Sequence, residues 1–240
     1  MTGSANSARQ GRPVQKLTES LGEFAYRVMR DAIRAGRFQP GQHLREADVA
    51  EWLQISRTPV REAFHRIVSE GLLTIGPWNG VMVSELETGQ LVQLYAVREV
   101  LEGAAAASAA RHATKTEIER MFKIAQVEAA HKKAPGKLVT INGELHSAIY
   151  TAARNPYLLQ SISSVVDALG LLRHSTFVLP GSIELAHREH MDILRAIRNG
   201  NASVAERLAR EHIRNALKMR LQLHALRTKE PASDDRKRGS

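Results

Sequence analysis

The sequence predicts a mostly α-helical protein in which an N-terminal winged helix-turn-helix is followed by an all-helical antiparallel bundle. Three segments with helical features precede two short apolar runs, which flank a turn-forming cluster of glycine, proline and asparagine. Past Gly89, apolar residues recur at helical spacing and there is no convincing strand alternation. Prolines and glycines divide that part into about six helices joined by short loops, which is the connectivity of an antiparallel bundle.

Composition divides the chain into four parts. Residues 1–17 and 227–240 are polar and basic with little apolar content, so we expect both to be disordered tails. Residues 18–86 are the expected winged helix-turn-helix domain, and residues 87–226 are the expected helical domain. A chain of 240 residues, 43% of them hydrophobic, can bury the cores of two such domains.

Composition also limits the class of protein. The chain has no cysteine, which excludes disulfides and thiolate metal sites. No signal peptide and no apolar run long enough to cross a bilayer is visible, so we expect a cytoplasmic protein without a membrane partner. The net charge of +9 suits an anionic partner, but residues 1–86 hold only 11 Lys and Arg against 9 Asp and Glu. Binding of nucleic acid must therefore depend on where the charges lie.

Capping residues and chain breakers mark the first two helices. The run from Ser20 to Ala35 starts with a capping-box pattern, has apolar residues near helical spacing and is followed by Gly36. Pro40-Gly41 turns the chain, and a short helix is expected from Glu46 to Leu53. Gln54-Ile55 then provides the tight turn into a third helix.

The third helix carries the most informative residues of the chain. Either Ser56 or Thr58 can cap it, and both choices put Pro59 in the first turn, where its missing N–H costs little. Arg57 and Arg61 lie four residues apart, so they project from one face near the helix N-terminus, whose backbone N–H groups can hold a phosphate. The pattern favours a DNA-recognition helix. An ordinary amphipathic surface helix is the alternative.

Two short strands are expected after Gly71, which ends the third helix. They comprise Leu72–Ile75 and Val81–Val83, around the turn-forming residues Gly76 to Gly80. Such a hairpin is a wing. The recognition helix would lie in the major groove of DNA, and the wing tip would reach the backbone or the minor groove.

Most of residues 18–84 resembles the GntR family of bacterial transcription regulators. The matching motifs are Pro40-Gly41, Leu44-Arg45-Glu46, Ser56-Arg57-Thr58-Pro59-Val60-Arg61-Glu62-Ala63, Glu70-Gly71-Leu72 and Gly80. The resemblance implies that Arg57 and Arg61 contact bases or phosphates. It also implies phosphate-holding roles for Ser56 and Thr58.

Two further positions follow from the same resemblance. Gly80 would let the wing approach DNA closely. Many family members have an arginine early in the second helix, where this chain has Ala47. Arg45 is the candidate that would replace this DNA contact.

The helical domain can be divided by its caps and breakers. Capping-box patterns begin at Thr114 and Ser203, and Pro135-Gly136, Asn155-Pro156 and Pro180-Gly181 interrupt the helices. The expected helices are Gln90–His112, Lys115–Lys132, Lys137–Ala153, Tyr157–Phe177, Ser182–Arg198 and Val204 to about Leu226. The interior of such a bundle is a common place for a ligand.

Polar residues occupy the apolar stripes of three of these helices. Asn142 and His146 are four residues apart and share a helical face, and His190 and His212 each lie on the apolar stripe of a later helix. A lone buried histidine is more often a hydrogen-bonded core residue than a ligand. Three imidazoles with a side-chain oxygen, however, suit a divalent metal such as Zn²⁺ or Ni²⁺.

Residues 90–225 are similar to the FCD effector domain of the FadR subfamily of GntR regulators. The supporting motifs are Tyr95 to Glu102, Asn142-x-x-Leu145-His146, Asn155-Pro156, Glu189-His190-x-x-Ile193-x-x-Ala196-Ile197 and Glu211-His212-Ile213. Metal-binding members have an aspartate, sometimes an asparagine, then a histidine four residues later and two more on the last two helices. The resemblance thus implies a metal bound by Asn142, His146, His190 and His212.

Arg98 and Glu102 lie one turn apart on an apolar stripe of the first bundle helix. One interpretation is an intrahelical ion pair. The other places Arg98 at a cavity, where it clamps the carboxylate of an effector. In similar proteins a small organic acid binds at or beside the metal, which favours the second. Glu102 and His187 are further candidates for this effector site.

These expectations describe a DNA-binding transcription regulator, with a repressor favoured over an activator, and not an enzyme. A homodimer would present two recognition helices to a near-palindromic operator in double-stranded DNA. A small carboxylate effector bound near the metal would change its affinity for that operator. Two alternatives stay open: a metal-dependent enzyme with an appended DNA-binding domain, and a regulator whose histidines are purely structural.

Overall fold

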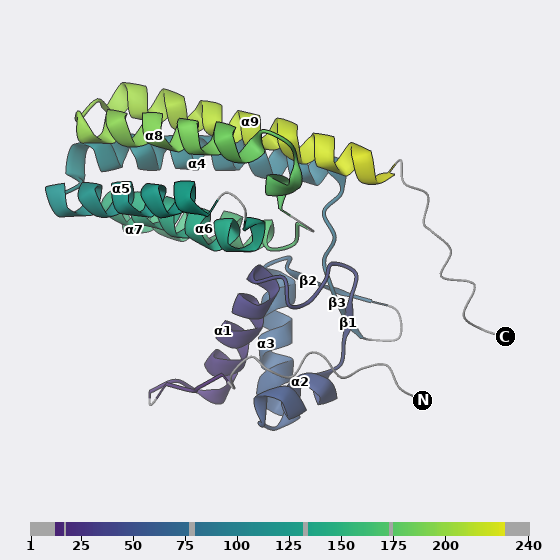
Figure 1. Ribbon diagram of the computed structural model, residues 1–240. Coiled ribbons are helices and arrows are strands. Elements are labelled where there is room, and N and C mark those ends of the chain that lie inside the picture. Colours follow the sequence, from purple (N-terminus) through teal and green to yellow (C-terminus); the bar gives the residue numbers. More distant parts are fainter. Residues whose placement is uncertain (1–12, 17, 77–79, 132–133, 173–174, 229–240) are drawn as a thin grey trace. The chain divides into compact units, whose positions relative to one another are not determined.

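The computed structural model describes residues 13–16, 18–76, 80–131, 134–172 and 175–228, and the elements are labelled in Figure 1. These residues form two compact units. The first contains the described residues up to Leu86 together with residues 166–172, and the second contains the others. Sequence reasoning had placed residues 166–172 in the helical domain. Most of the expected N-terminal tail and residues 229–240 of the expected C-terminal tail lie outside the described residues.

Three helices and a small sheet make up the first unit. The helices are α1 (Leu21–Arg34), α2 (Glu46–Leu53) and α3 (Arg57–Ser69). The predicted capping box of α1 is present, because the Ser20 hydroxyl accepts from the Glu23 backbone N–H and the Glu23 carboxylate accepts from that of Ser20. α1 packs against α3, and their fully buried side chains include Met29, Ile33 and Ile67.

The helix-turn-helix depends on a left-handed residue between α2 and α3. Gln54 has φ 55°, a conformation that closes the short turn and lets Ser56 occupy the N-cap position of α3. Of the two predicted caps, the structure therefore uses Ser56, although its side chain makes no capping hydrogen bond. Gly71, with φ 77°, follows the end of α3, as the sequence predicts.

The wing is a three-stranded antiparallel sheet of β1 (His43–Leu44), β2 (Leu73–Ile75) and β3 (Val81–Val83), in the order β1-β3-β2. Met82 of β3 pairs with Thr74 on one side and with His43 on the other. The strand β1 was not predicted, because two residues are too few to show an alternating pattern. Pro77, Trp78 and Asn79 of the predicted wing turn lie outside the described residues.

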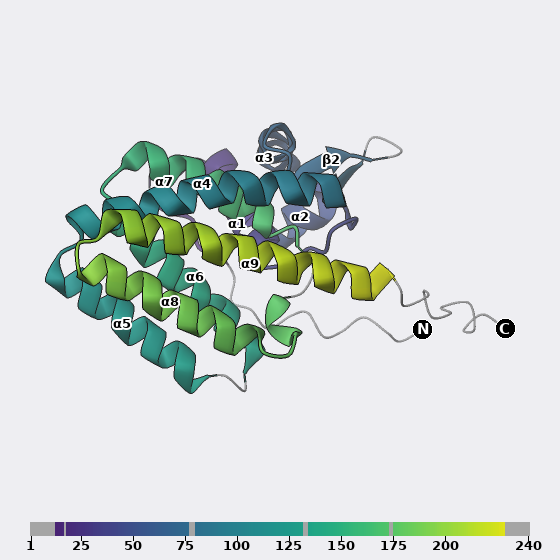
Figure 2. The ribbon, with the colours of Figure 1, turned by 90° about the horizontal axis from the view of Figure 1, so that it is seen from above.

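The second unit is built from helices throughout the residues that the structure describes. In chain order they are α4 (Thr88–His112), α5 (Lys115–Ala130), α6 (Pro135–Ala152), α7 (Pro156–Leu169), the short 3₁₀ helix η2 (Thr176–Val178), α8 (Ser182–Arg198) and α9 (Ala202–Thr228). The last residues of α7 group with the first unit. α4 and α9 pack side by side along much of their length (Figure 2).

Two predictions for this unit were wrong. α7 ends at Leu169 instead of Phe177, because the chain turns at Gly170. Inside a helix, glycine lowers the stability by about 1 kcal/mol relative to alanine. α9 starts before the predicted cap, Ser203: the Asn201 carboxamide accepts from the Val204 backbone N–H at 3.2 Å and so occupies the capping role. By contrast, the predicted capping box at Thr114 is present at the start of α5.

The core of the second unit lies where α4, α5, α6, α8 and α9 meet. Its fully buried side chains include Met121, Leu145, Leu194 and Ile197. Buried alanines between Ala105 and Ala109 let other helices approach α4 closely. None of the described helices is long and apolar enough to cross a membrane.

Candidate functional site

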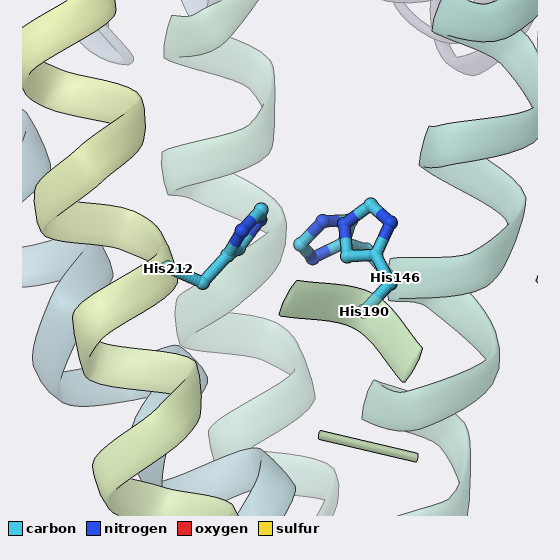
Figure 3. Close-up of side chains that lie close together, drawn as sticks. All are labelled: His146, His190 and His212. Atoms are coloured by element: carbon cyan, nitrogen blue, oxygen red, sulfur yellow. The ribbon is translucent and has the colours of Figure 1, made fainter. Parts of the chain in front are cut away.

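Three histidines from three different helices converge inside the second unit. His146 of α6, His190 of α8 and His212 of α9 are all buried, and their rings point toward one another (Figure 3). The ring centroids are 5.3 Å apart for His146 and His190, 5.4 Å for His146 and His212, and 4.7 Å for His190 and His212. One ring nitrogen of each histidine lies within 4.8 Å of the others, close enough to share one metal ion.

Each of these rings is held by a carboxylate at its Nδ1 atom. The pairs are His146 with Glu102 at 2.7 Å, His190 with Glu128 at 3.0 Å and His212 with Glu189 at 2.7 Å. An ionised carboxylate only accepts hydrogen bonds, so a neutral imidazole placed against it carries its proton on Nδ1. The lone pair of each ring is then on Nε2, the atom that is left for a metal.

The Nε2 atoms of His146 and His190 are buried and have no hydrogen-bond partner among the described residues. Buried polar atoms are rarely left unsatisfied, and the exceptions call for an unseen water or ion. In proteins that bind a metal through histidine, one ring nitrogen faces the metal and the other is commonly hydrogen-bonded to a carboxylate, and these rings have the same arrangement. The residues therefore fit a divalent metal of the Zn²⁺ class.

The protonation states also suit metal binding. Burial lowers the pKa of His212 to about 4, even though the Glu189 carboxylate opposes this shift. Burial also lowers the pKa of His146, against the effect of Glu102. Metal ligation requires neutral imidazole, and at neutral pH these two rings are neutral.

Charged partners keep the carboxylates ionised. Burial opposes ionisation of Glu102, but Arg98 and His146 outweigh it and hold the pKa of this carboxyl well below its usual range. Burial likewise opposes ionisation of Glu128, whose hydrogen bonds with His190 and His187 lower its pKa. The cluster thus combines the neutral rings of His146 and His212 with ionised carboxylates.

Arg98 and Glu102 form the intrahelical ion pair that was one of the two interpretations of this motif. The Arg98 Nε atom contacts Glu102 Oε1, while Glu102 Oε2 accepts from His146, so one carboxylate joins the guanidinium to the histidine cluster. Both side chains are buried, and the Arg98 guanidinium also lies over the ring of Tyr95. Arg98 is therefore connected to the histidine cluster through the carboxylate of Glu102.

The other predicted residues of this region have distinct surroundings. Asn142 is half-buried one helical turn before His146, and its side chain makes no hydrogen bond within the described part of the chain. The His187 Nδ1 atom lies 3.0 Å from Glu128 Oε2, so His187 shares its carboxylate with His190. His187 does not belong to the three-histidine cluster itself.

Sequence reasoning missed the carboxylates of Glu128 and Glu189. Glu128 is 2% exposed and follows the buried residues Met121 and Ala125 on one stripe of α5. An acid on an apolar stripe is a signal that could have found it, because buried acids are almost always paired. Glu189 lies beside His190 in a quoted motif, but its contact with His212 across the helices carries no signal in the sequence.

The predicted DNA-contacting side chains of the helix-turn-helix are exposed in the first unit. Ser56, Arg57 and Thr58 are exposed at the start of α3, and Arg45 is exposed at the N-cap position of α2. The Gly80 carbonyl accepts from the Gly76 backbone N–H at 2.8 Å and closes the base of the wing turn.

Arg61 differs from these residues because it is paired. Its Nε and Nη2 atoms donate to the two carboxylate oxygens of Glu46 at 2.8 and 2.9 Å. This pair joins the first turn of α2 to the exposed face of α3. Sequence reasoning did not assign a role to Glu46.

Comparison with protein families gives two matches. The FCD domain matches residues 93–215, and the bacterial regulatory proteins of the gntR family match residues 21–83. Together they span both units of the structure.

Individual proteins agree with these matches. The chain is 32% identical over 158 residues to the Nta operon transcriptional regulator of Aminobacter aminovorans, covering 65% of this chain and 73% of that protein. It is 24% identical over 198 residues to the HTH-type transcriptional repressor RspR of Escherichia coli, covering 82% and 87%. Among solved structures, E. coli McbR/YncC has the same fold, with a TM-score of 0.76 at 22% identity over 85% of this chain and 99% of that one.

Proposed function

Because the chain belongs to the GntR family of DNA-binding transcription regulators and carries an FCD domain, we propose that a divalent metal and a small organic acid in the helical domain control its affinity for operator DNA. The matched families and relatives are regulators of transcription, so the protein is a regulator and not an enzyme. The metal, the organic acid and their effect on DNA binding are the proposal.

The observation that supports the metal is the direction of the three imidazoles. The Nδ1 atoms of His146, His190 and His212 each contact a carboxylate. The Nε2 atoms of His146 and His190 are buried without a hydrogen-bond partner among the described residues. A purely structural histidine would use both nitrogens or leave one in water. A zinc-type or nickel-type ion would satisfy these atoms, with Asn142 as the proposed fourth ligand.

Each element of the bundle would contribute to this site. α6, α8 and α9 supply the imidazoles, and α4, α5 and α8 supply the carboxylates that orient them. When bound, the metal would supply a Lewis-acid position at which an organic acid can bind. Arg98, Glu102 and His187 are the proposed contacts on the protein side of the effector site.

We further propose that the protein is a homodimeric repressor that the effector releases from a near-palindromic operator. The repressor assignment is supported by the relative RspR, which is named as a repressor. Ser56, Arg57, Thr58, Arg61, Arg45 and Gly80 are the proposed DNA contacts, and all lie in the helix-turn-helix and its wing.

Elemental analysis of the purified protein tests the metal. The wild type should contain about one metal ion per chain, and the double variant His146→Ala, His190→Ala should contain almost none. His43→Ala, His112→Ala removes two exposed histidines and is the matched control, which should keep its metal. Full occupancy of the first double variant would place the metal elsewhere. A wild type that neither contains nor binds zinc or nickel would leave the histidines structural.

Operator binding tests the effector. A panel of mono-, di- and tricarboxylates is added to wild type and to Arg98→Ala, each bound to an operator selected from random DNA. An acid that releases the wild type should act much more weakly on Arg98→Ala, while the metal content stays unchanged. An equal response of both proteins would contradict the role of Arg98 without affecting the metal site.

A further inference from the structure

Glu46 and Arg61 form a two-point ion pair between the two helices of the helix-turn-helix. Arg61 Nε donates to Glu46 Oε1 at 2.8 Å, and Arg61 Nη2 donates to Glu46 Oε2 at 2.9 Å. The Arg61 side chain is nevertheless 61% exposed, and that of Glu46 is 31% exposed. Exposed pairs contribute little to folding stability, so stability alone does not explain this geometry.

The surroundings of Glu46 are basic. Arg57, Arg61 and His65 are spaced four residues apart on the exposed face of α3. The hydrogen bonds from Arg61 hold the pKa of the Glu46 carboxyl below its usual range. Burial opposes this shift, and the charges of Arg61, Arg57 and His65 add to the lowering. One acid from α2 therefore faces the basic row that the recognition helix presents.

The pairing determines which edge of the Arg61 guanidinium is left free. A guanidinium has five N–H donors in a rigid plane. Glu46 occupies the side edge formed by Nε and Nη2. The end edge, formed by Nη1 and the second hydrogen of Nη2, remains available, and two parallel donors of this kind match the O6 and N7 acceptors of guanine in the major groove.

We propose that Glu46 is a positioning residue for DNA recognition, which fixes the plane of Arg61 so that its end edge meets a guanine of the operator. The proposal rests on the DNA-contacting role proposed above for Arg61. Without Glu46 the long arginine side chain would rotate freely and would contact phosphates on any sequence.

The test compares variants on an operator that the wild type selects from random DNA. Dissociation constants are measured at one salt concentration for the operator, for the operator with each guanine replaced in turn, and for non-specific DNA. The variants are Glu46→Gln, Arg61→Ala and the double variant. Asp48→Asn is the matched control, because Asp48 is an exposed acid in the same first turn of α2 and forms no ion pair among the described residues.

We expect both Glu46→Gln and Asp48→Asn to strengthen non-specific binding slightly, because each removes one negative charge. Only Glu46→Gln should reduce the ratio of specific to non-specific affinity, by about tenfold, and mainly at the guanine where Arg61→Ala also relaxes discrimination. At that base pair the double variant should lose no more discrimination than Arg61→Ala alone. Melting temperatures should stay close to that of the wild type.

Three results would overturn the proposal, each in a different way. If Glu46→Gln changes the ratio of specific to non-specific affinity no more than Asp48→Asn does, Glu46 acts only through its negative charge. If its effect is uniform over all base pairs, Arg61 grips a phosphate instead of a base. If Arg61→Ala leaves operator affinity unchanged, the DNA-contacting role proposed for Arg61 fails, and the positioning role fails with it.

Discussion

The two units use the same three residue types, arginine, glutamate and histidine, under opposite conditions of burial. In the first unit the Arg61 and Glu46 side chains are 61% and 31% exposed. In the second unit the Arg98 and Glu102 side chains are 11% and 6% exposed. Both are ion pairs, but only the first lies largely in water.

This difference determines what each pair can do. In water, screening makes an exposed pair weak, so it adds little to folding stability, and the free edge of its arginine stays accessible to DNA. In a buried site, charges interact strongly and an unpaired charge is costly, so the pair stays fixed. Glu102 then holds His146 in one orientation inside the protein, whereas Glu46 orients Arg61 at the surface.

The largest expected effect is on folding stability. Glu102→Gln leaves the buried Arg98 guanidinium without its counter-charge, and breaking a buried pair in this way costs about 3–5 kcal/mol of unfolding free energy. Glu46→Gln makes the same chemical change in the exposed pair and should leave the urea midpoint almost unchanged. Urea unfolding of both variants, with chelator present, measures the contrast. Equal midpoints would show that Arg98 is not as isolated from water as the structure indicates.

Metal removal should have the next largest effect. A ligand that binds only the folded state adds about 4 kcal/mol of stability at a thousand times its dissociation constant. Chelator should therefore lower the melting temperature of the wild type, with little effect on the His146→Ala, His190→Ala double variant. The exposed-histidine control His43→Ala, His112→Ala should respond as the wild type does. A chelator-sensitive double variant would contradict the assignment of these ligands.

The exposed face should respond through binding instead of stability. Arg57→Ala and Arg61→Ala should each weaken operator binding roughly tenfold to a hundredfold while the melting temperature stays constant, because both side chains lie on the surface. Raising the salt concentration should weaken operator binding by the wild type more steeply than binding by a variant that has lost a phosphate contact. Unchanged operator affinity in both variants would mean that α3 is not the recognition helix.

The sequence was most informative where one local pattern decides the outcome. Ser20 and Glu23 start α1 through a capping box that can be recognised from spacing alone. His146, His190 and His212 could each be placed on an apolar stripe, and packing such stripes inward brings the three rings together.

Contacts between distant segments could not be predicted in this way. Nothing in the sequence indicates that Glu128 of α5 would meet His190 of α8, because the contact depends on how two helices are aligned along each other. The end of α7 was missed for a related reason. Apolar residues continue beyond Gly170, and periodicity does not show that the chain turns there.

The smallest expected effect concerns pH, and it applies to the buried cluster. In the folded, metal-free protein burial lowers the pKa of His212 to about 4, whereas an unfolded histidine has its ordinary value of 6.5. Between pH 6.5 and 5 the unfolded chain therefore binds a proton at this position that the folded chain does not. By linkage, the stability should fall as pH falls through this window, with a contribution from His212 of up to about 1.4 kcal/mol per pH unit. Urea unfolding of chelated wild type and His212→Gln at several pH values measures that slope. The variant should have the shallower slope, and equal slopes would mean that the His212 imidazole takes up a proton in the folded protein as readily as in the unfolded chain.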